Sequence, residues 1–271
     1  MSLFCHIKCS KIKIDKFVSK DSIFRIQQKG DEMKVIKRIL IIILLIIIFI
    51  IAGFVYKGHE LYKQALEQIS ISDKVAEIKL DENYTKLEDM SEFYKDAVIA
   101  VEDRRFYEHG AIDPIALARA VYSNIKAKEL REGGSTITQQ LAKNVYFTQE
   151  KSALRKIAEI FMAYDLEKNI DKDTILELYL NTSYFGDGYY CVAEASRGYY
   201  KKEPKDMNRN EASMLAGIPN APSAYCPTKH LDLAKKRQNQ VLDKMVRYEF
   251  ITAEEKEEIL NESNAVEDNK D

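Results

Sequence analysis

One uncharged, strongly apolar stretch sets the main limit on how this chain can fold. The segment Ile39–Tyr56 reads "ILIIILLIIIFIIAGFVY", and a helix needs about 20 such residues to cross the hydrocarbon layer of a bilayer. A helix that is apolar on all sides must be covered by protein or by lipid. The sequence therefore predicts a transmembrane helix over residues 34–57.

The alternative is a cleaved signal peptide, whose apolar region is about 7 to 15 residues long and ends at a small-residue cleavage site. Here "GFVYKGHELYK" closes the run, which favours a retained anchor.

Basic residues precede the span, namely Lys34, Lys37 and Arg38, and further upstream Lys8, Lys11, Lys13, Lys16, Lys20, Arg25 and Lys29. Because positive charge stays cytoplasmic, we expect a single-pass cell-membrane protein with a cytoplasmic N-terminus and all residues after Lys57 outside.

The rest of the chain divides into four further regions. Residues 1–33 form a basic cytoplasmic tail, although "MKVIKRILIII" from Met33 would also suit a gene start. A stalk of mixed charge over 58–80 leads to a globular domain over 81–260, and the acidic segment 261–271 forms a frayed tail. With 271 residues, 46% of them apolar, the chain fits one medium-sized domain plus these accessory segments.

The globular region is expected to be mainly α-helical. Apolar residues recur at helical spacing in "FYKDAVIAVED", "ALRKIAEIFMAYDLEKN", "DTILELYLN" and "NEASMLAGI". The sequence shows neither a long repeat nor sustained two-residue alternation, so solenoids and β-sandwiches are set aside. The formal net charge of −2 gives no reason to expect nucleic acid as a partner.

The four cysteines show no metal-type spacing. Cys5 and Cys9 fall on the inner side of the span, and Cys191 and Cys226 fall on the outer side. A disulfide between the two outer cysteines is left open, because spacing alone does not decide connectivity.

The segment "GGSTITQQLAKN", residues 133–144, predicts an exposed helix start. Thr136 followed by Gln139 is a capping-box pattern, and Gly133 and Gly134 allow a tight turn before it. Unpaired N–H groups at such a start suit a phosphate, and Lys143 lies one turn further on. Taken alone the signal is weak, since most capped helix starts bind nothing.

Charged residues on both sides of this segment strengthen the signal. Lys151, Arg155 and Lys156 follow it, and Glu159 shares a helical face with Arg155, although a solvated ion pair would explain that spacing equally well. Glu102, before it, ends an apolar helical stretch, where the helix dipole disfavours acids. It is either one of a simple cluster of helix-end acids or a partly desolvated proton acceptor. Two carboxylates around a phosphate-binding patch indicate acid/base chemistry on a sugar carried by a phosphate.

Five blocks of the sequence resemble the peptidoglycan glycosyltransferases, the polymerising domain of bifunctional penicillin-binding proteins and of monofunctional transglycosylases. The blocks are "EDRRFYEH", "GGSTITQQLAKN", "RKIAE", "ILELYLNTSYFGDG" and "NEASMLAGIPNAPSAYCP". They occur in the family's order over about residues 85–247. Two positions depart from the family pattern. After "FYEH" the family usually has one residue and then glycine, whereas this chain has Gly110 followed by Ala111. Cys191 stands where glycine is common in the family.

The resemblance implies a mainly α, lysozyme-like glycosyltransferase domain with a small membrane-proximal jaw. Its substrates would be lipid II and the growing glycan chain. It would join them into β-1,4-linked strands with inversion at C1 and release of undecaprenyl diphosphate. Glu102 would be the general base. Glu159 would assist departure of the diphosphate, either alone or through a divalent cation such as Mg²⁺, and no other cofactor is implied.

The remaining site residues follow from the same resemblance. The basic residues that would meet the diphosphate are Lys143, Lys151, Arg155 and Lys156, and the residues that would line the cleft are Ser135, Thr136, Gln139 and Gln140. Asp103 and Phe106 belong to the first block, as does His109, which suits packing better than chemistry.

Two other functions remain to be weighed. A lysozyme-like hydrolase or lytic transglycosylase would share the fold and the catalytic glutamate, and a non-catalytic scaffold would bind glycan or other cell-wall synthesis proteins. A transpeptidase domain is not expected here, because the Ser-x-x-Lys string Ser123–Lys126 has no Lys-Thr-Gly partner in the sequence.

Overall fold

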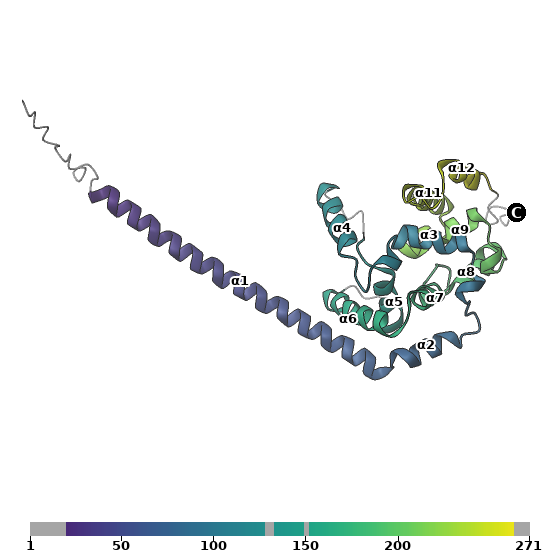
Figure 1. Cartoon of the computed structure of the whole chain (residues 1–271), viewed down its shortest axis with the longest axis horizontal. Coiled ribbons are helices and arrows are strands. Elements are labelled where there is room, and N and C mark those ends of the chain that lie inside the picture. Colours follow the sequence, from purple (N-terminus) through teal and green to yellow (C-terminus); the bar gives the residue numbers. More distant parts are fainter. Residues whose placement is uncertain (1–19, 128–132, 149–151, 263–271) are drawn as a thin grey trace, which may run out of the picture. The chain divides into compact units, whose positions relative to one another are not determined.

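The computed structural model describes residues 20–127, 133–148 and 152–262. Within these ranges it contains helices and no strand, which confirms the mainly α fold (Figure 1). The chain forms two compact units, Met1–Gly53 and Phe54–Asp271.

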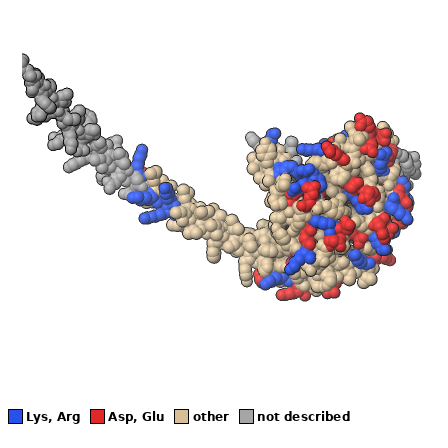
Figure 2. Space-filling model, in the orientation of Figure 1, with Lys and Arg blue, Asp and Glu red and all other residues tan. Residues whose placement is uncertain are grey.

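The described part of the first unit belongs to helix α1 (Lys20–Gln68). The part from Glu32 onward has a mean hydropathy of 3.4 in its most apolar window and is long and apolar enough to cross a membrane. Its large apolar side chains are exposed, as shown by Phe49 at 80%. Figure 2 shows Lys and Arg gathered at one end of its uncharged stretch, which is the position of Lys34, Lys37 and Arg38.

The second unit contains the last turns of α1 and eleven further α-helices in its described part. These are α2 (Ile71–Lys79), α3 (Glu92–Glu102), α4 (Pro114–Ala127), α5 (Ile137–Tyr146), α6 (Ala153–Asn169), α7 (Lys172–Thr182), α8 (Val192–Tyr200), α9 (Arg209–Gly217), α10 (Pro222–Tyr225), α11 (Leu231–Arg247) and α12 (Ala253–Asn261). Short 3₁₀ turns occur at Leu87–Asp89, Phe106–Glu108, Pro204–Asp206 and Ile218–Asn220.

The core of this unit forms where α5 packs against α6 and α7, and where α3 packs against α9 and α11. Large side chains that are fully buried include Tyr94, Phe106, Tyr179 and Phe185. Aromatic residues of this size dominate the energetics of a core, because each removes 150–250 Å² from water. The helices that carry the predicted site residues, α3, α5 and α6, are therefore held by well-packed neighbours.

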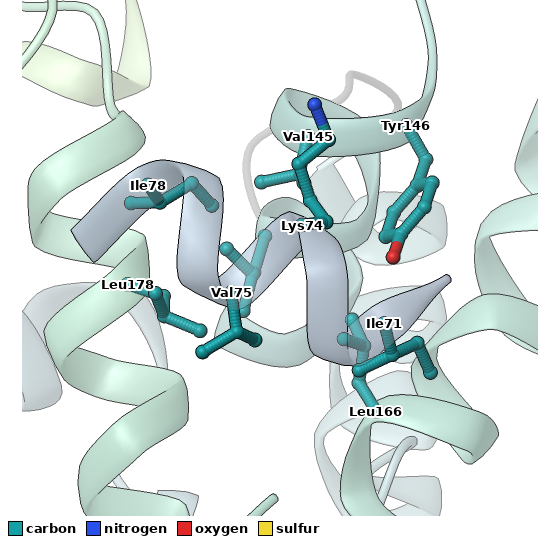
Figure 3. A pocket seen from close by; sticks show the side chains of 9 residues that line it. Ile71, Lys74, Val75, Ile78, Val145, Tyr146, Leu166 and Leu178 are labelled. Atoms are coloured by element: carbon teal, nitrogen blue, oxygen red, sulfur yellow. The ribbon is translucent and has the colours of Figure 1, made fainter. Parts of the chain in front are cut away.

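Residues 58–80 differ from the expected stalk, because they belong to the globular unit. α2 starts at its cap Ser70, whose Oγ accepts a hydrogen bond of 3.2 Å from Asp73 N. Its apolar stripe, which includes Ile71 and Val75, packs on α5, α6 and α7 (Figure 3). A helix that buries one apolar face is part of a core, so the domain begins well before residue 81.

The fourth sequence block supports the end of α7. Glu177 forms a half-buried ion pair of 3.4 Å with Lys79, and Asn181 exchanges two 2.8 Å hydrogen bonds with the backbone of Thr85. The chain then turns at "FGDG", where Gly186 has φ of 84°. This left-handed conformation favours glycine, and a Cβ there would also lie 3.2 Å from the carbonyl oxygen of Pro222.

The outer cysteines are both buried and unpaired, so the structure has no disulfide between Cys191 and Cys226. The sulfur of Cys191 caps helix α8 by accepting a hydrogen bond of 3.5 Å from Glu194 N. Cys5 and Cys9 lie outside the described residues.

Candidate functional site

The start of α5 has the capping box that the spacing of Thr136 and Gln139 predicts. Gln139 N donates to Thr136 Oγ1 at 3.1 Å, and Thr136 N donates to Gln139 Oε1 at 3.0 Å. The Thr136 hydroxyl also donates to the carbonyl of Ala111 at 2.8 Å. Both side chains are buried. The structure therefore places Thr136 and Gln139 inside the helix cap rather than along a substrate cleft.

The Asp103 carboxylate accepts a hydrogen bond from another N–H group at the start of α5. Its Oδ2 accepts a hydrogen bond of 3.1 Å from the backbone of Ile137, and its Oδ1 lies 2.7 Å from Nε2 of His109. The N–H groups of Thr136, Ile137 and Gln139 are thus bonded within the protein, so most of this helix start is not open to phosphate, contrary to the expectation. Asp103 joins the loop after α3 to α5, a structural role.

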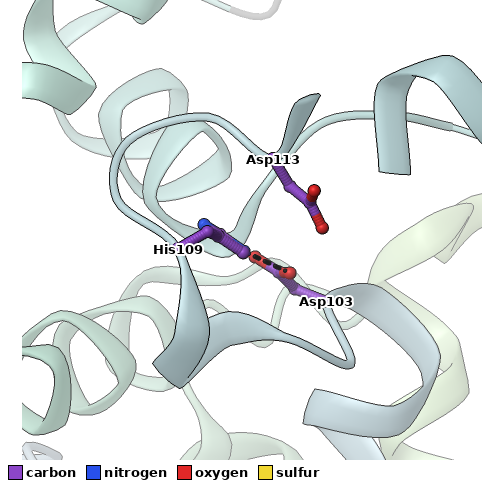
Figure 4. A group of neighbouring side chains, drawn as sticks. All are labelled: Asp103, His109 and Asp113. Atoms are coloured by element: carbon purple, nitrogen blue, oxygen red, sulfur yellow. Dashed lines mark hydrogen bonds and ion pairs between the residues drawn. The ribbon is translucent and has the colours of Figure 1, made fainter. Parts of the chain in front are cut away.

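Asp103, His109 and Asp113 are the described residues whose donor atoms lie close enough to hold a metal ion, all within 4.8 Å of one another (Figure 4). Asp113, however, is paired with Arg105 and accepts 2.9 Å hydrogen bonds from Ile115 N and Ala116 N at the start of α4. Because the carboxylates already have protein partners, this cluster is an ion-pair network that ties α4 to the loop.

Two further residues of the first block are structural. Phe106 is fully buried, and Nζ of Lys172 lies 4.4 Å from the centre of its ring, so it forms part of the core rather than a substrate contact. Burial is the largest single effect and lowers the pKa of His109, but the hydrogen bond and charge of Asp103 and the hydrogen bond with Gly110 together leave that pKa raised overall.

Glu102 is the last residue of α3 and is held on both sides. Its Oε2 accepts a hydrogen bond of 2.8 Å from Nε2 of Gln140. The Gln140 amide is oriented by the Tyr179 hydroxyl, which donates to its Oε1 at 3.3 Å. The other oxygen, Oε1, is buried without a hydrogen-bond partner among the described residues and lies 3.8 Å from Nη2 of Arg237. The site therefore contains a positioned carboxylate that retains accepting capacity.

Glu159 lies on α6 and is only 2% exposed. Lys156 Nζ is 2.9 Å from its Oε2 and also donates to Ser135 Oγ at 2.7 Å. Arg155 Nε is 2.7 Å from its Oε1, although the N–H does not point at that oxygen, so the contact is an ion pair rather than a hydrogen bond. This pair is largely buried, unlike the solvated pair that its spacing alone suggested.

Lys143 on α5 connects the two carboxylates electrostatically. Burial lowers its pKa, and the nearby charges of Arg155 and Lys156 lower that pKa further, while Glu159 and Glu102 oppose the shift. A lysine affected by all four groups lies within electrostatic range of each. The residues that these interactions link are Glu102, Ser135, Gln140, Lys143, Arg155, Lys156 and Glu159, which we call the carboxylate–cation cluster.

Lys151, also expected there, lies outside the described residues. Three residues that contact Glu102 or its surroundings were not predicted from the sequence, namely Tyr179, Arg237 and Lys244. Lys244 and its partner Val101 are 143 positions apart, so no local spacing signal could have identified that contact.

The surroundings of Glu159 do not suit a divalent cation. Mg²⁺ prefers several oxygen ligands and retains water. Glu159 is instead one carboxylate paired with Arg155 and Lys156, and the charge of Lys143 also acts on it. The donor set fits an anionic group placed next to Lys143, Arg155 and Lys156 better than it fits a metal.

A small pocket lies beneath α2 and is lined mainly by apolar residues of α2, α5, α6 and α7 (Figure 3). None of its lining residues belongs to the carboxylate–cation cluster. Tyr146 Oη has no hydrogen-bond partner among the described residues, and burial, aided by Asp73 and Glu77, raises the pKa of Tyr146 to about 12. An apolar pocket of this kind does not suit a charged diphosphate.

The family model described as Transglycosylase matches residues 71–246. Penicillin-binding protein 1A of Neisseria lactamica is 45% identical over 179 residues, which cover 66% of this chain and 22% of that protein. Penicillin-binding protein 1F of Bacillus subtilis is 39% identical over 241 residues, 86% of this chain and 34% of that protein. The chain therefore spans about a fifth to a third of these relatives.

Among solved structures, the crystal structure of penicillin-binding protein 1A from Haemophilus influenzae is 31% identical, with a TM-score of 0.33, over 47% of this chain and 16% of that chain. The family match covers more than half of the sequence and contains every residue of the carboxylate–cation cluster. The chain belongs to the transglycosylase family, the peptidoglycan glycosyltransferases that also form the N-terminal domain of bifunctional penicillin-binding proteins.

Proposed function

We propose that this protein is a membrane-anchored glycosyltransferase that polymerises lipid II into β-1,4-linked glycan strands, with Glu102 as the general base. One observation carries the proposal. Gln140, which holds the Glu102 carboxylate, lies one helical turn from Lys143 on α5, and α5 packs against α6, where Glu159 holds Arg155 and Lys156. A base and a group of cations within one site suit a reaction that removes a proton and expels an anion.

In the proposed reaction, Glu102 accepts the proton of the acceptor sugar's 4-hydroxyl as that oxygen attacks C1 of the donor chain. The new C–O bond forms on the face opposite the departing diphosphate, so the bond from C1 to the diphosphate breaks and the configuration inverts. Gln140 holds one carboxylate oxygen at 2.8 Å. This fixes the direction in which the base faces, a requirement for efficient proton transfer.

The cations stabilise the negative charge that develops on the leaving diphosphate, which is often the largest contribution to such catalysis. Lys143, Arg155 and Lys156 would supply these charges. Glu159 holds Arg155 and Lys156 through contacts of 2.7 and 2.9 Å. Its proposed role is therefore to organise the cations, and no step requires a metal ion at Glu159.

Two surfaces support contact with the cytoplasmic membrane. The apolar part of α1 is long enough to span it, and the basic residues before the span favour a cytoplasmic N-terminus. Within the globular unit, α4 exposes large apolar side chains, namely Ile115, Leu117, Val121, Tyr122 and Ile125. Exposed apolar patches mark protein or membrane contacts, and an enzyme anchored beside a lipid substrate meets it at a raised local concentration.

The second candidate function is cleavage of finished glycan by a lytic enzyme of similar fold. A hydrolase of this kind has no diphosphate to stabilise, so the three cations around Glu159 favour synthesis. A non-catalytic scaffold would have no need of the positioned carboxylate at residue 102.

The test uses the full chain in vesicles that contain lipid II, with glycan polymer and released muropeptides measured separately. Wild-type protein should form polymer, and Glu102→Gln should lower turnover by about 100-fold or more, because general-base catalysis contributes 10²–10⁴-fold. Glu92→Gln on the same helix is the matched control, since the Glu92 side chain is 79% exposed. Soluble muropeptides without polymer would support cleavage, and wild-type turnover in Glu102→Gln would remove Glu102 as the base.

A further inference from the structure

Helix α11 places two cations against the end of α3 that carries Glu102. Nη2 of Arg237 lies 3.8 Å from Glu102 Oε1, and Nζ of Lys244 donates a hydrogen bond of 2.7 Å to the carbonyl of Val101. The two cations are two helical turns apart, so they share one face of α11, and α11 packs against α3. Cations stabilise the C-terminal end of a helix, and here one of them also reaches the carboxylate.

Arg237 is fixed by partners of its own. It is only 9% exposed, its Nε donates to the carbonyl of Gly217 at 3.2 Å, and its Nη1 donates to Gln240 Oε1 at 3.2 Å. Gly217 gives the arginine room, because a Cβ at that position would lie 2.9 Å from Arg237 Cγ. Arginine is rarely buried unless it is paired, and Glu102 is the carboxylate within salt-bridge distance.

The two oxygens of Glu102 have different partners. Oε2 is held by the neutral amide of Gln140, whereas Oε1 is buried with no hydrogen bond from any described residue and faces the guanidinium of Arg237. Unlike charges a few Å apart attract each other more strongly at a partly buried site than in water. Gln140 therefore holds one carboxylate oxygen by a hydrogen bond, and Arg237 holds the other by charge, so the carboxylate is fixed from two sides.

We infer that Arg237 is a positioning residue for the glycosyl transfer, holding the Glu102 carboxylate in place from the side of α11. This inference rests on the proposed role of Glu102 as the base. Arg237 acts through Glu102, so its loss should reduce the rate of the chemical step and leave binding of the donor diphosphate nearly unchanged.

The experiment measures kcat and KM for lipid II polymerisation by the full chain in vesicles. In Arg237→Met, kcat should fall by about 100-fold, the loss that a small misplacement of a reacting group can cause, with KM within a factor of about two. Arg237→Lys keeps the charge and should recover part of kcat. Lys236→Met, the same change at an exposed position of α11, should behave as wild type.

Circular dichroism and thermal unfolding of every variant show whether the fold is retained. If Arg237→Met does not fold, Gly217→Ala decides the question, because its Cβ displaces the arginine stem and keeps every charge. A lower kcat with unchanged KM in that variant supports the inference. Wild-type kcat in a folded Arg237→Met overturns the inference. If Arg237→Met does not fold, wild-type kcat in Gly217→Ala overturns it instead. An equal loss of kcat in Arg237→Lys and Arg237→Met also overturns the inference.

Glu102→Gln measured in parallel separates the two proposals. If Glu102→Gln polymerises like wild type, the proposed base is wrong and the role of Arg237 fails with it. If Glu102→Gln is inactive while folded Arg237→Met has wild-type kcat, only the role of Arg237 fails.

Discussion

Asp103 Oδ2 accepts a hydrogen bond of 3.1 Å from the backbone N–H of Ile137. This bond joins the residue that follows the proposed base to the first turn of α5, which carries Gln140 and Lys143. The position of the proposed base relative to α5 therefore depends on a buried carboxylate whose two oxygens have protein partners.

Asp103→Asn tests this dependence. The amide retains the shape of the side chain but removes the charge and weakens the bonds to Ile137 and His109, so we expect a loss of about 1–3 kcal/mol in the free energy of unfolding. Chemical denaturation of the full chain in detergent measures it. Asp206→Asn, a change of the same chemistry at an exposed aspartate, serves as the control, and equal stability of the two variants would contradict the role given to Asp103.

The His109–Asp103 pair should make stability depend on pH. Because the folded state raises the pKa of His109 overall, the pair contributes fully below the unfolded value of about 6.5, and the contribution disappears as pH rises through the folded pKa. The melting temperature of wild type should therefore fall more between about pH 6 and pH 9 than that of His109→Gln. His230→Gln, at an exposed histidine, should keep the wild-type dependence; an unchanged slope in His109→Gln would refute the prediction.

Local features of the fold were predictable from the sequence, and the reason is physical. The capping box of Thr136 and Gln139 involves residues three positions apart, so spacing alone determines it. The end of α3 at Glu102 and the turn after α7 follow in the same way, from apolar periodicity and from glycine. The chemistry of Glu102 and Glu159 came from family motifs, and the structure adds which neighbours hold each carboxylate.

Contacts between distant segments could not be predicted in this way. α2 resembled a stalk because its apolar stripe is short and lies among charged residues, and only its contacts with α5, α6 and α7 place it in the core. Arg237 lies on a highly charged helix where nothing local distinguishes it from Lys235 or Lys236. Its partner Glu102 is reached only because α11 packs against α3.

Loss of the Lys143 charge should raise the KM for lipid II at a lower pH than the pKa of an ordinary lysine. Burial and the charges of Arg155 and Lys156 lower its pKa, so Lys143 loses its charge at a lower pH than an ordinary lysine, whose pKa is about 10.4. The KM for lipid II should therefore begin to rise below that pH. Lys143→Arg keeps the charge and should move the rise to higher pH, because an arginine stays protonated. Identical KM profiles for the two proteins would exclude Lys143 as the titrating cation.

The same lysine can be removed altogether. Lys143→Met should raise KM or lower kcat/KM by about tenfold or more, since hydrogen bonds to charged groups contribute about 1.5–3 kcal/mol. Lys205→Met, at an exposed lysine in the Pro204–Asp206 turn, is the control. Unchanged steady-state kinetics in a folded Lys143→Met would show that the diphosphate does not use this residue.

The last turns of α1 pack against α6, the helix that carries Glu159. Gly58 lies so close to α6 that an added Cβ would be 2.5 Å from Cγ2 and 2.7 Å from Cβ of Ile157. The next turn continues the contact, since the ring centroids of His59 and Phe161 are 5.0 Å apart and the Tyr62 hydroxyl donates to Asp165. Gly58→Val should therefore force the helices apart and lower stability by about 1–3 kcal/mol, the usual result of overpacking. Gly53→Val on the same helix is the matched control, because a Cβ at Gly53 meets nothing within 4 Å. Thermal unfolding of the two full-length variants in detergent makes the comparison, and equal melting temperatures would show that α1 does not dock on α6 through Gly58.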